Sequence, residues 1–154
     1  MKIEARVGGD GVTAPRLVST SAADSAAMID RFLADHPEGV MFVEVKRDDP
    51  RSWDEWKDDL EDIEYMHVGM AGDWAAAQYV RGGFRAKLDI ASVRATHNRT
   101  PKTEPVPYDE VLKWYFPPET VISREQVRRL MIHYATTGEW LDEIPSRNHD
   151  YLVR

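Results

Sequence analysis

The sequence predicts an α+β fold in which a mostly antiparallel, meander-like sheet carries two or three flanking helices. Two kinds of pattern support this prediction. Apolar residues recur at helical spacing in segments that begin at a capping residue and end near glycine or proline. Short runs rich in β-branched and aromatic residues lie between these segments, several of them separated by glycine-containing turns. From the chain length, we expect a single domain over residues 1–154.

Two segments show the spacing of amphipathic helices. The first follows Ser21 and ends at Pro37. Its apolar stripe comprises Ile29, Phe32, Leu33 and His36. The second follows a capping box of Ser123 and Gln126 and ends at Gly138. Its stripe comprises Val127, Leu130, Met131, Tyr134 and Ala135.

Strands are predicted where β-branched and aromatic residues cluster or alternate with polar ones. The predicted strands are residues 2–7, 16–19, 40–45, 65–70, 74–81, 84–93, 111–116 and 139–144, and residues 145–154 follow as a short C-terminal tail. Pro117 and Pro118 leave only a short connection between the strand at 111–116 and the last helix. We therefore expect Trp114 and Tyr134 to be core residues that join these two elements.

Residues 48–64, which we call the acidic segment, hold an unusual concentration of negative charge. They contain nine acidic and two basic residues, whereas the whole chain has 27 and 20. The rest of the chain therefore has 18 of each, and the formal net charge of −7 comes from this segment alone. Ser52 and Glu55 form a capping box, which predicts a helix from Trp53 to Ile63.

The acidic segment has two interpretations. In one, Trp53 and Trp56 anchor the helix in the core and the acids form a solvated face. In the other, the acids form a surface for a partner. Such a function would explain why the helix tolerates like charges at i, i+4, which destabilise it by a few tenths of a kcal/mol per pair. Such a surface repels nucleic acid and attracts a basic protein. The candidate partner-binding residues are Trp53, Trp56, Asp58, Asp59, Glu61 and Asp62.

The sequence has no pattern that indicates catalysis or metal binding. It contains no cysteine, and its five histidines do not occur at metal-ligand spacing. His67, in a predicted strand, is expected to be structural. There is no phosphate-binding glycine loop, nucleophile motif, secretory signal or membrane-length apolar run. We therefore expect a cytoplasmic protein that is not an enzyme, has no cofactor or metal, and binds neither nucleic acid nor membrane.

Four short motifs punctuate the second half of the chain. They are His67-Val68-Gly69, Phe116-Pro117-Pro118, Thr137-Gly138 and Trp140. Over residues 21–144 this arrangement resembles the immunity proteins paired with deaminase toxins in bacterial polymorphic toxin systems. The resemblance implies a cytosolic protein that binds and blocks a cognate toxin domain, and it identifies no binding residues. The acidic segment departs from the family pattern as an enlargement of a shorter connection.

Three functions remain open at this point. The leading hypothesis is an immunity protein that occludes the active site or nucleic-acid groove of a basic deaminase toxin. The alternative is a non-catalytic α+β binding or scaffold module for another basic protein. A third is a small hydrolase or transferase whose site carries no sequence motif. An adjacent gene with a zinc-deaminase pattern favours the first, whereas a deep pocket lined by convergent polar groups favours the third.

Overall fold

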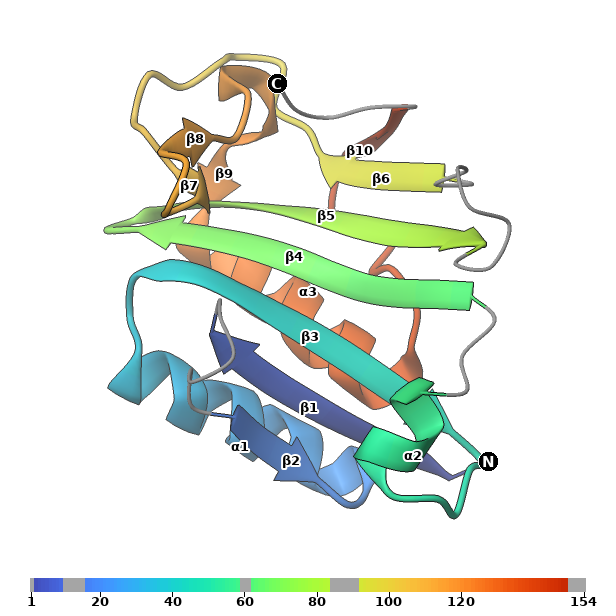
Figure 1. Ribbon diagram of the computed structural model, residues 1–154. Helices are drawn as coiled ribbons and strands as arrows, with labels where there is room; N and C mark the ends of the chain where they lie inside the picture. The colour runs from blue at the N-terminus through green and yellow to red at the C-terminus, as the bar shows by residue number, and fades with distance from the viewer. Residues whose placement is uncertain (1, 10–15, 59–61, 84–91, 150–154) are drawn as a thin grey trace.

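An antiparallel sheet forms the centre of the fold (Figure 1). The computed structural model describes residues 2–9, 16–58, 62–83 and 92–149. Within these residues, eight strands form one sheet in the order β10-β6-β5-β4-β3-β1-β2, and β9 pairs with the start of β5. The strands are β1 (Ile3–Gly9), β2 (Arg16–Ser19), β3 (Gly39–Arg47), β4 (Asp62–Ala71), β5 (Trp74–Gly83), β6 (Ser92–Thr96), β9 (Ile122–Ser123) and β10 (Ser146–His149). Every pairing is antiparallel, which confirms the predicted α+β class.

The two faces of the sheet are covered by different elements (Figure 1). Helices α1 (Ala22–Asp35) and α3 (Arg124–Thr137) pack together on one face, which we call the inner face. The opposite, outer face carries the short helix α2 (Trp53–Asp58) and a hairpin made of β7 (Pro107–Asp109) and β8 (Trp114–Tyr115). A one-turn 3₁₀ helix, η1 (Pro118–Thr120), follows the hairpin. None of the helices in the described ranges has the length and apolarity needed to cross a membrane.

Alternation along the central strands separates core residues from outer-face residues, because successive side chains of a strand point to opposite faces. On the inner face, β3 contributes Met41, Val43 and Val45 to the core shared with α1 and α3. The intervening outer-face residues are Phe42, Glu44 and Lys46. The same alternation in β4 places Met66, Val68 and Met70 in the core. The inner face is therefore the main hydrophobic core, and the outer face is left for other contacts.

The two predicted amphipathic helices are confirmed as α1 and α3, and α3 has the predicted ends. The hydroxyl of Ser123 accepts a hydrogen bond from the Gln126 N–H at 3.2 Å, and the Gln126 side chain accepts one from the Ser123 N–H at 3.2 Å. Gly138 adopts the left-handed conformation with φ 74°, and its N–H donates to the Tyr134 carbonyl. The predicted stripe is buried throughout, at Val127, Leu130, Met131, Tyr134 and Ala135.

Residues 111–116 do not form a buried strand. Trp114 and Tyr115 pair with β7 in the outer-face hairpin, and the side chain of Trp114 is 40% exposed. Tyr134 is fully buried, as predicted, but on the inner face. The predicted core role of Trp114 and its contact with Tyr134 are therefore wrong, because the sheet lies between the two residues.

The C-terminal tail contains a strand that was not predicted. Ser146–His149 form β10, which pairs with β6 at one end of the sheet. Residues 139–144, predicted as a strand, instead form turns that bury Trp140, whose indole N–H donates to the Ile144 carbonyl at 3.0 Å. Of the strand predicted at 84–93, residues 84–91 lie outside the described residues, and β6 begins at Ser92.

Candidate partner-binding surface

Trp53 is the centre of the contact between α2 and the outer face. Its ring lies over the Arg6 guanidinium, 4.7 Å from the ring centroid, and over the Lys46 ammonium at 5.2 Å. Trp56 packs edge to face against Trp53, with 5.2 Å between ring centroids. Both cations are buried, which strengthens their attraction to the ring. These four residues, which we call the α2 platform, hold the helix on β1 and β3.

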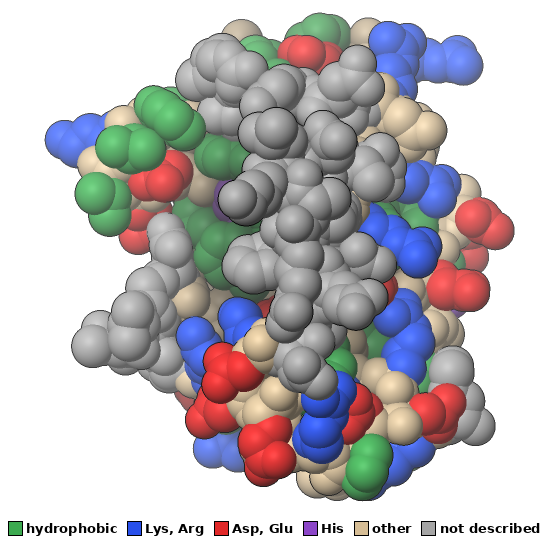
Figure 2. All heavy atoms as spheres, turned by 45° about the vertical axis from the view of Figure 1, so that its right-hand side comes forward, with side chains coloured by type: hydrophobic (Ala, Val, Ile, Leu, Met, Phe, Trp, Pro, Cys, Tyr) green, Lys and Arg blue, Asp and Glu red, His purple; other side chains and the backbone are tan. Residues whose placement is uncertain are grey.

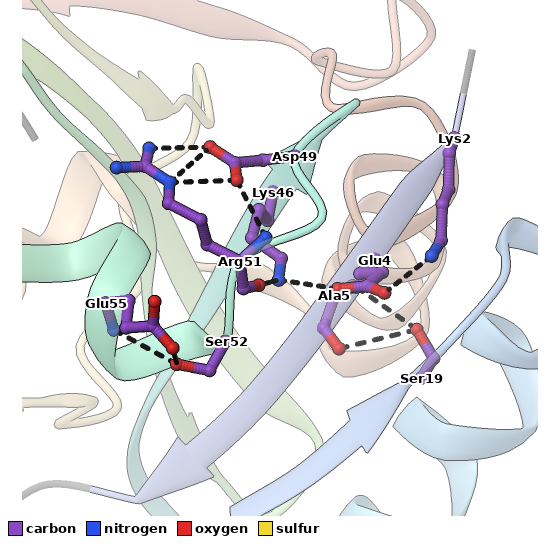
Figure 3. A network of polar contacts seen from close by, with 9 residues as sticks. All are labelled: Lys2, Glu4, Ala5, Ser19, Lys46, Asp49, Arg51, Ser52 and Glu55. Atoms are coloured by element: carbon purple, nitrogen blue, oxygen red, sulfur yellow. Dashed lines mark hydrogen bonds and ion pairs between the residues drawn. The ribbon is translucent and has the colours of Figure 1, made fainter. Parts of the chain in front are cut away.

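Ion pairs tie the start of the acidic segment to the sheet (Figure 3). Lys46 Nζ lies 2.8 Å from Glu4 Oε2 and also donates to the carbonyl oxygen of Arg51. The Arg51 guanidinium in turn pairs with Asp49 at 2.6 Å and holds the pKa of that carboxyl at about 2. A buried ammonium without partners would be strongly destabilising. The buried Lys46 is therefore compensated by Glu4 and by the main chain of the acidic segment.

The acids of the acidic segment divide into structural and exposed residues. Glu64 is structural, since both of its carboxylate oxygens accept hydrogen bonds from the Arg47 guanidinium at 2.8 and 2.9 Å. Burial would raise the pKa of Glu64, but its hydrogen bonds and ion pair with Arg47 keep the value lowered. Asp49 is likewise committed to Arg51. The exposed acids of α2 are Asp54, Glu55 and Asp58.

The helix of the acidic segment is shorter than predicted. It ends at Asp58, and β4 begins at Asp62, which lies opposite Gly83 of β5. Asp62 therefore belongs to a strand and not to the acidic face of a helix. The two candidate tryptophans are half-buried in the α2 platform, and Asp58 is exposed. The other two candidates, Asp59 and Glu61, lie outside the described residues.

The hairpin packs on β4 through an aromatic cluster around His67. The His67 ring lies 4.3 Å from the Tyr108 ring and 5.4 Å from the Phe116 ring, centroid to centroid. His67 Nε2 is 2.8 Å from the Tyr108 carbonyl oxygen and Nδ1 is 3.1 Å from the Gln78 amide nitrogen, which assigns the proton to Nε2. Burial lowers the pKa of His67 to about 4, so the ring is neutral at pH 7. His67 is a structural residue, as predicted.

Gly69 allows the hairpin to lie directly against β4. A Cβ atom at this position would overlap the carbonyl oxygen of Pro107 and would lie 3.0 Å from both Phe116 and Val106. The two sequence motifs that contain Gly69 and Phe116 therefore meet in one contact. Their spacing reflects the docking of the hairpin onto the sheet.

Replacing Gly69 by alanine is expected to displace the hairpin and to lower the free energy of unfolding by about 1–3 kcal/mol, as overpacking usually does. The local readout is hydrogen exchange of the Phe116 amide, which donates to the Val106 carbonyl at 2.9 Å. This amide should lose protection in Gly69→Ala. It should keep its protection in Gly72→Ala, where the added Cβ meets no atom within 4 Å and the cost is confined to backbone strain at φ 59° in the β4–β5 turn. Equal protection in both variants would contradict the docking role of Gly69.

The tip of the hairpin is apolar and exposed to solvent. The exposed fractions of Val111, Leu112, Trp114 and Tyr115 are 85, 55, 40 and 56%, and we call these four residues the hairpin tip. Figure 2 shows hydrophobic side chains gathered at the upper left, at the height of β7 and β8 in Figure 1. Sequence reasoning missed this surface, because an apolar run does not reveal what covers it. The sequence signal for a turn at this point was Asp109, a residue type that favours turns. Its carboxylate accepts a hydrogen bond from the Leu112 N–H at 2.8 Å.

No metal centre is indicated by the part of the chain that the structure describes. These residues include no group of three or more histidine, aspartate or glutamate side chains arranged to hold a metal ion. An open depression of about 620 Å³ lies between the end of α1 and the β4–β5 turn. The Arg124 guanidinium in it donates to the carbonyl oxygens of Pro37 and Gly72. This charged group is therefore used to hold neighbouring loops together.

A charged helix on a cation-supported platform and an exposed apolar hairpin share one face of the sheet, and such a combination is typical of protein-binding surfaces. The chain belongs to the Imm1 immunity protein family, since the family model described as Immunity protein Imm1 matches residues 13–147. It is therefore an immunity protein, the antitoxin of a toxin system, and its family implies a cognate toxin as partner. A search of curated proteins and a search of solved structures found no significant match.

Proposed function

We propose that the protein binds a deaminase-type toxin domain of a polymorphic toxin system and inhibits it by occluding its active site or nucleic-acid groove. It does so in the cytoplasm as a stoichiometric inhibitor, without catalysis, cofactor or metal. The observation that carries this proposal is the set of exposed acids that α2 presents from a fixed platform, in a chain that belongs to an immunity family. An enzyme that deaminates nucleic acid needs a positive groove for the phosphates beside a pocket for the base.

The arrangement of α2 suits a complementary contact with such a groove. The α2 platform fixes the helix from beneath, so that Asp54 and Asp58 project one helical turn apart without ordering a flexible loop. In the proposed complex these carboxylates take the place of phosphates opposite basic side chains of the toxin. Their long-range field also steers the two proteins together and raises the association rate. The proposed contact residues are the acids Asp54, Asp58, Asp59, Glu61 and Asp62, together with Trp53 and Trp56, which hold the helix and are only half-buried.

The double variant Asp54→Lys with Asp58→Lys is expected to slow association with the toxin about tenfold or more at low salt. The effect should shrink at high salt, because exposed charges are screened over about 8 Å at physiological ionic strength. If the carboxylates are desolvated in the complex, dissociation also accelerates, and each truncation costs about 2–5 kcal/mol of binding. The measurement is binding kinetics with the toxin domain encoded by the adjacent gene, at two salt concentrations.

A matched control is the double variant Glu139→Lys with Asp142→Lys, which changes the net charge equally. Both residues are exposed and lie in the segment after α3, on the inner side of the sheet. The control should associate at nearly the rate of the unmodified protein. Equal kinetics of the two double variants would leave α2 as a solvated face. The deaminase class is tested separately, by assaying the toxin for base deamination with and without the immunity protein.

A further inference from the structure

The hairpin tip exposes apolar side chains that a monomer in water has no reason to expose together. Four of the five large hydrophobic side chains found exposed in the described ranges lie within residues 111–115, and the fifth is Val18. Burying such side chains against a partner removes apolar surface from water and stabilises the complex. A contiguous exposed group of this kind is typical of an interaction site.

The base of the hairpin is held by hydrogen bonds and buried residues, so the tip is presented in a defined position. The carboxylate of Glu110 accepts a hydrogen bond from the Val40 N–H of β3 at 2.7 Å. The N–H of Phe116 donates to the Val106 carbonyl at 2.9 Å, and both of these residues are buried. Between them, Lys113 adopts the left-handed conformation with φ 56°. An anchor that is already ordered before binding loses little conformational entropy in the complex.

The hairpin tip and α2 are close enough to contact one partner. Along the outer face of β3, Lys46 lies under α2 and Val40 bonds to the hairpin, with Glu44 and Phe42 between them. Six residues of a strand span roughly 20 Å. A standard interface of about 800 Å² per partner is about 30 Å across. One protein lying across the outer face can therefore cover both elements, which project from it at opposite ends (Figure 1).

We propose that the hairpin tip is the apolar anchor of the toxin interface, with Leu112 and Trp114 inserted into an apolar pocket of the toxin beside its basic groove. This inference rests on the proposed function for the identity of the partner. The occupant is the toxin and not a second copy of this chain, because each copy carries a net charge of −7 that originates in the acidic segment on the same face. The acids steer the two proteins together and fix their relative orientation, and the hairpin tip makes dissociation of the complex slow.

The test compares the unmodified protein with Leu112→Ser/Trp114→Ser in binding to the toxin domain encoded by the adjacent gene. An aromatic anchor that becomes fully buried in an interface costs at least about 2 kcal/mol on truncation, which corresponds to about a 30-fold loss of affinity. We expect this loss in the dissociation rate, with the salt dependence of association unchanged, and failure to restore growth when the toxin is co-expressed. Melting temperatures should differ by only a few degrees, because the exposed fractions of Leu112 and Trp114 in the free protein are 55 and 40%.

Two further variants keep the result interpretable. Val18→Ser alters an exposed apolar side chain on β2 and should bind normally. Val111→Asp alters the most exposed residue of the hairpin tip and should weaken binding even if the double variant folds poorly. Unchanged toxin affinity in both hairpin variants overturns the inference, and so does a change confined to self-association. If the toxin binds but has no deaminase activity, the proposed deaminase class of the partner is wrong, while the inference about the hairpin tip stands.

Discussion

Replacing Tyr134 by alanine is expected to lower the free energy of unfolding by about 3–5 kcal/mol, a large part of the roughly 5–15 kcal/mol of a typical domain. The side chain is fully buried in α3 and packs edge to face on Tyr79, with 5.6 Å between ring centroids. Its hydroxyl donates to Glu64 at 3.3 Å, and Glu64 is held by Arg47, which also donates to the Gly138 carbonyl. Alanine at this position leaves a cavity and deprives Glu64 of a donor.

Tyr134→Phe is the matched control, because it keeps the ring and removes the hydroxyl alone. It should cost about 1–3 kcal/mol, the usual loss for a hydrogen bond to a charged group. Urea unfolding of the three proteins, followed by far-ultraviolet circular dichroism, gives both differences. An alanine variant within 1 kcal/mol of the unmodified protein would refute the central role of Tyr134 in the core.

Acidification from pH 7 to pH 4 is expected to remove about 3 kcal/mol of stability through His67 alone. Burial lowers the pKa of this ring from 6.5 to about 4. Between these values the unfolded chain binds a proton that the folded protein does not, so stability rises with pH over this window. The contribution is complete above pH 6.5 and is lost as the pH falls toward 4. Each pH unit within the window corresponds to about 1.4 kcal/mol.

The measurement is urea unfolding at intervals between pH 4 and 7.5, compared with His67→Gln. The variant has no titrating group at this position, so its stability should change less over the same range. The lowered pKa values of Glu4, Asp30 and Glu64 also make stability fall in acid, below their ordinary values of 3.8–4.5. These carboxylates are present in both proteins and cancel in the difference. Parallel pH profiles would show that His67 does not titrate in this window.

The elements that sequence reasoning predicted well are those in which local and tertiary preferences agree. In α3, the Ser123 cap, the buried stripe and the left-handed Gly138 all specify the same helix. The strands at the centre of the sheet carry enough β-branched and apolar residues to be recognised without knowledge of their neighbours. For such segments the sequence pattern and the fold carry the same information.

The errors arise where pairing partners decide the structure. Ile63 continues the helical stripe of the acidic segment, yet it pairs with Gly82 of β5 because the ladder between β4 and β5 outweighs local helix preference. Ser146–His149 have no apolar pattern, and β10 is held by backbone pairing with β6. Neither outcome can be derived from local composition, because the partner strand is distant in the sequence.

The candidate surface was predicted in part. The charge count identified the acidic segment, and α2 presents some of its acids to solvent. The count could not distinguish the exposed Asp58 from Glu64, which pairs with Arg47. Trp114 of the hairpin tip was assigned to the core, because Trp114 and Phe116 belong to one apolar run although only Phe116 is buried. Distinguishing an anchor for a partner from an anchor for the core requires the fold.

The α2 platform separates the residues that hold the helix from those that it presents to solvent. Arg6, Lys46 and Trp53 hold α2 through cation–π contacts, whereas Asp54 and Asp58 project from its other side. If these positions contact the toxin as proposed, substitutions there alter recognition while they leave folding intact. For a lineage exposed to changing toxins, the proposed contact would decouple the evolution of specificity from the maintenance of the fold.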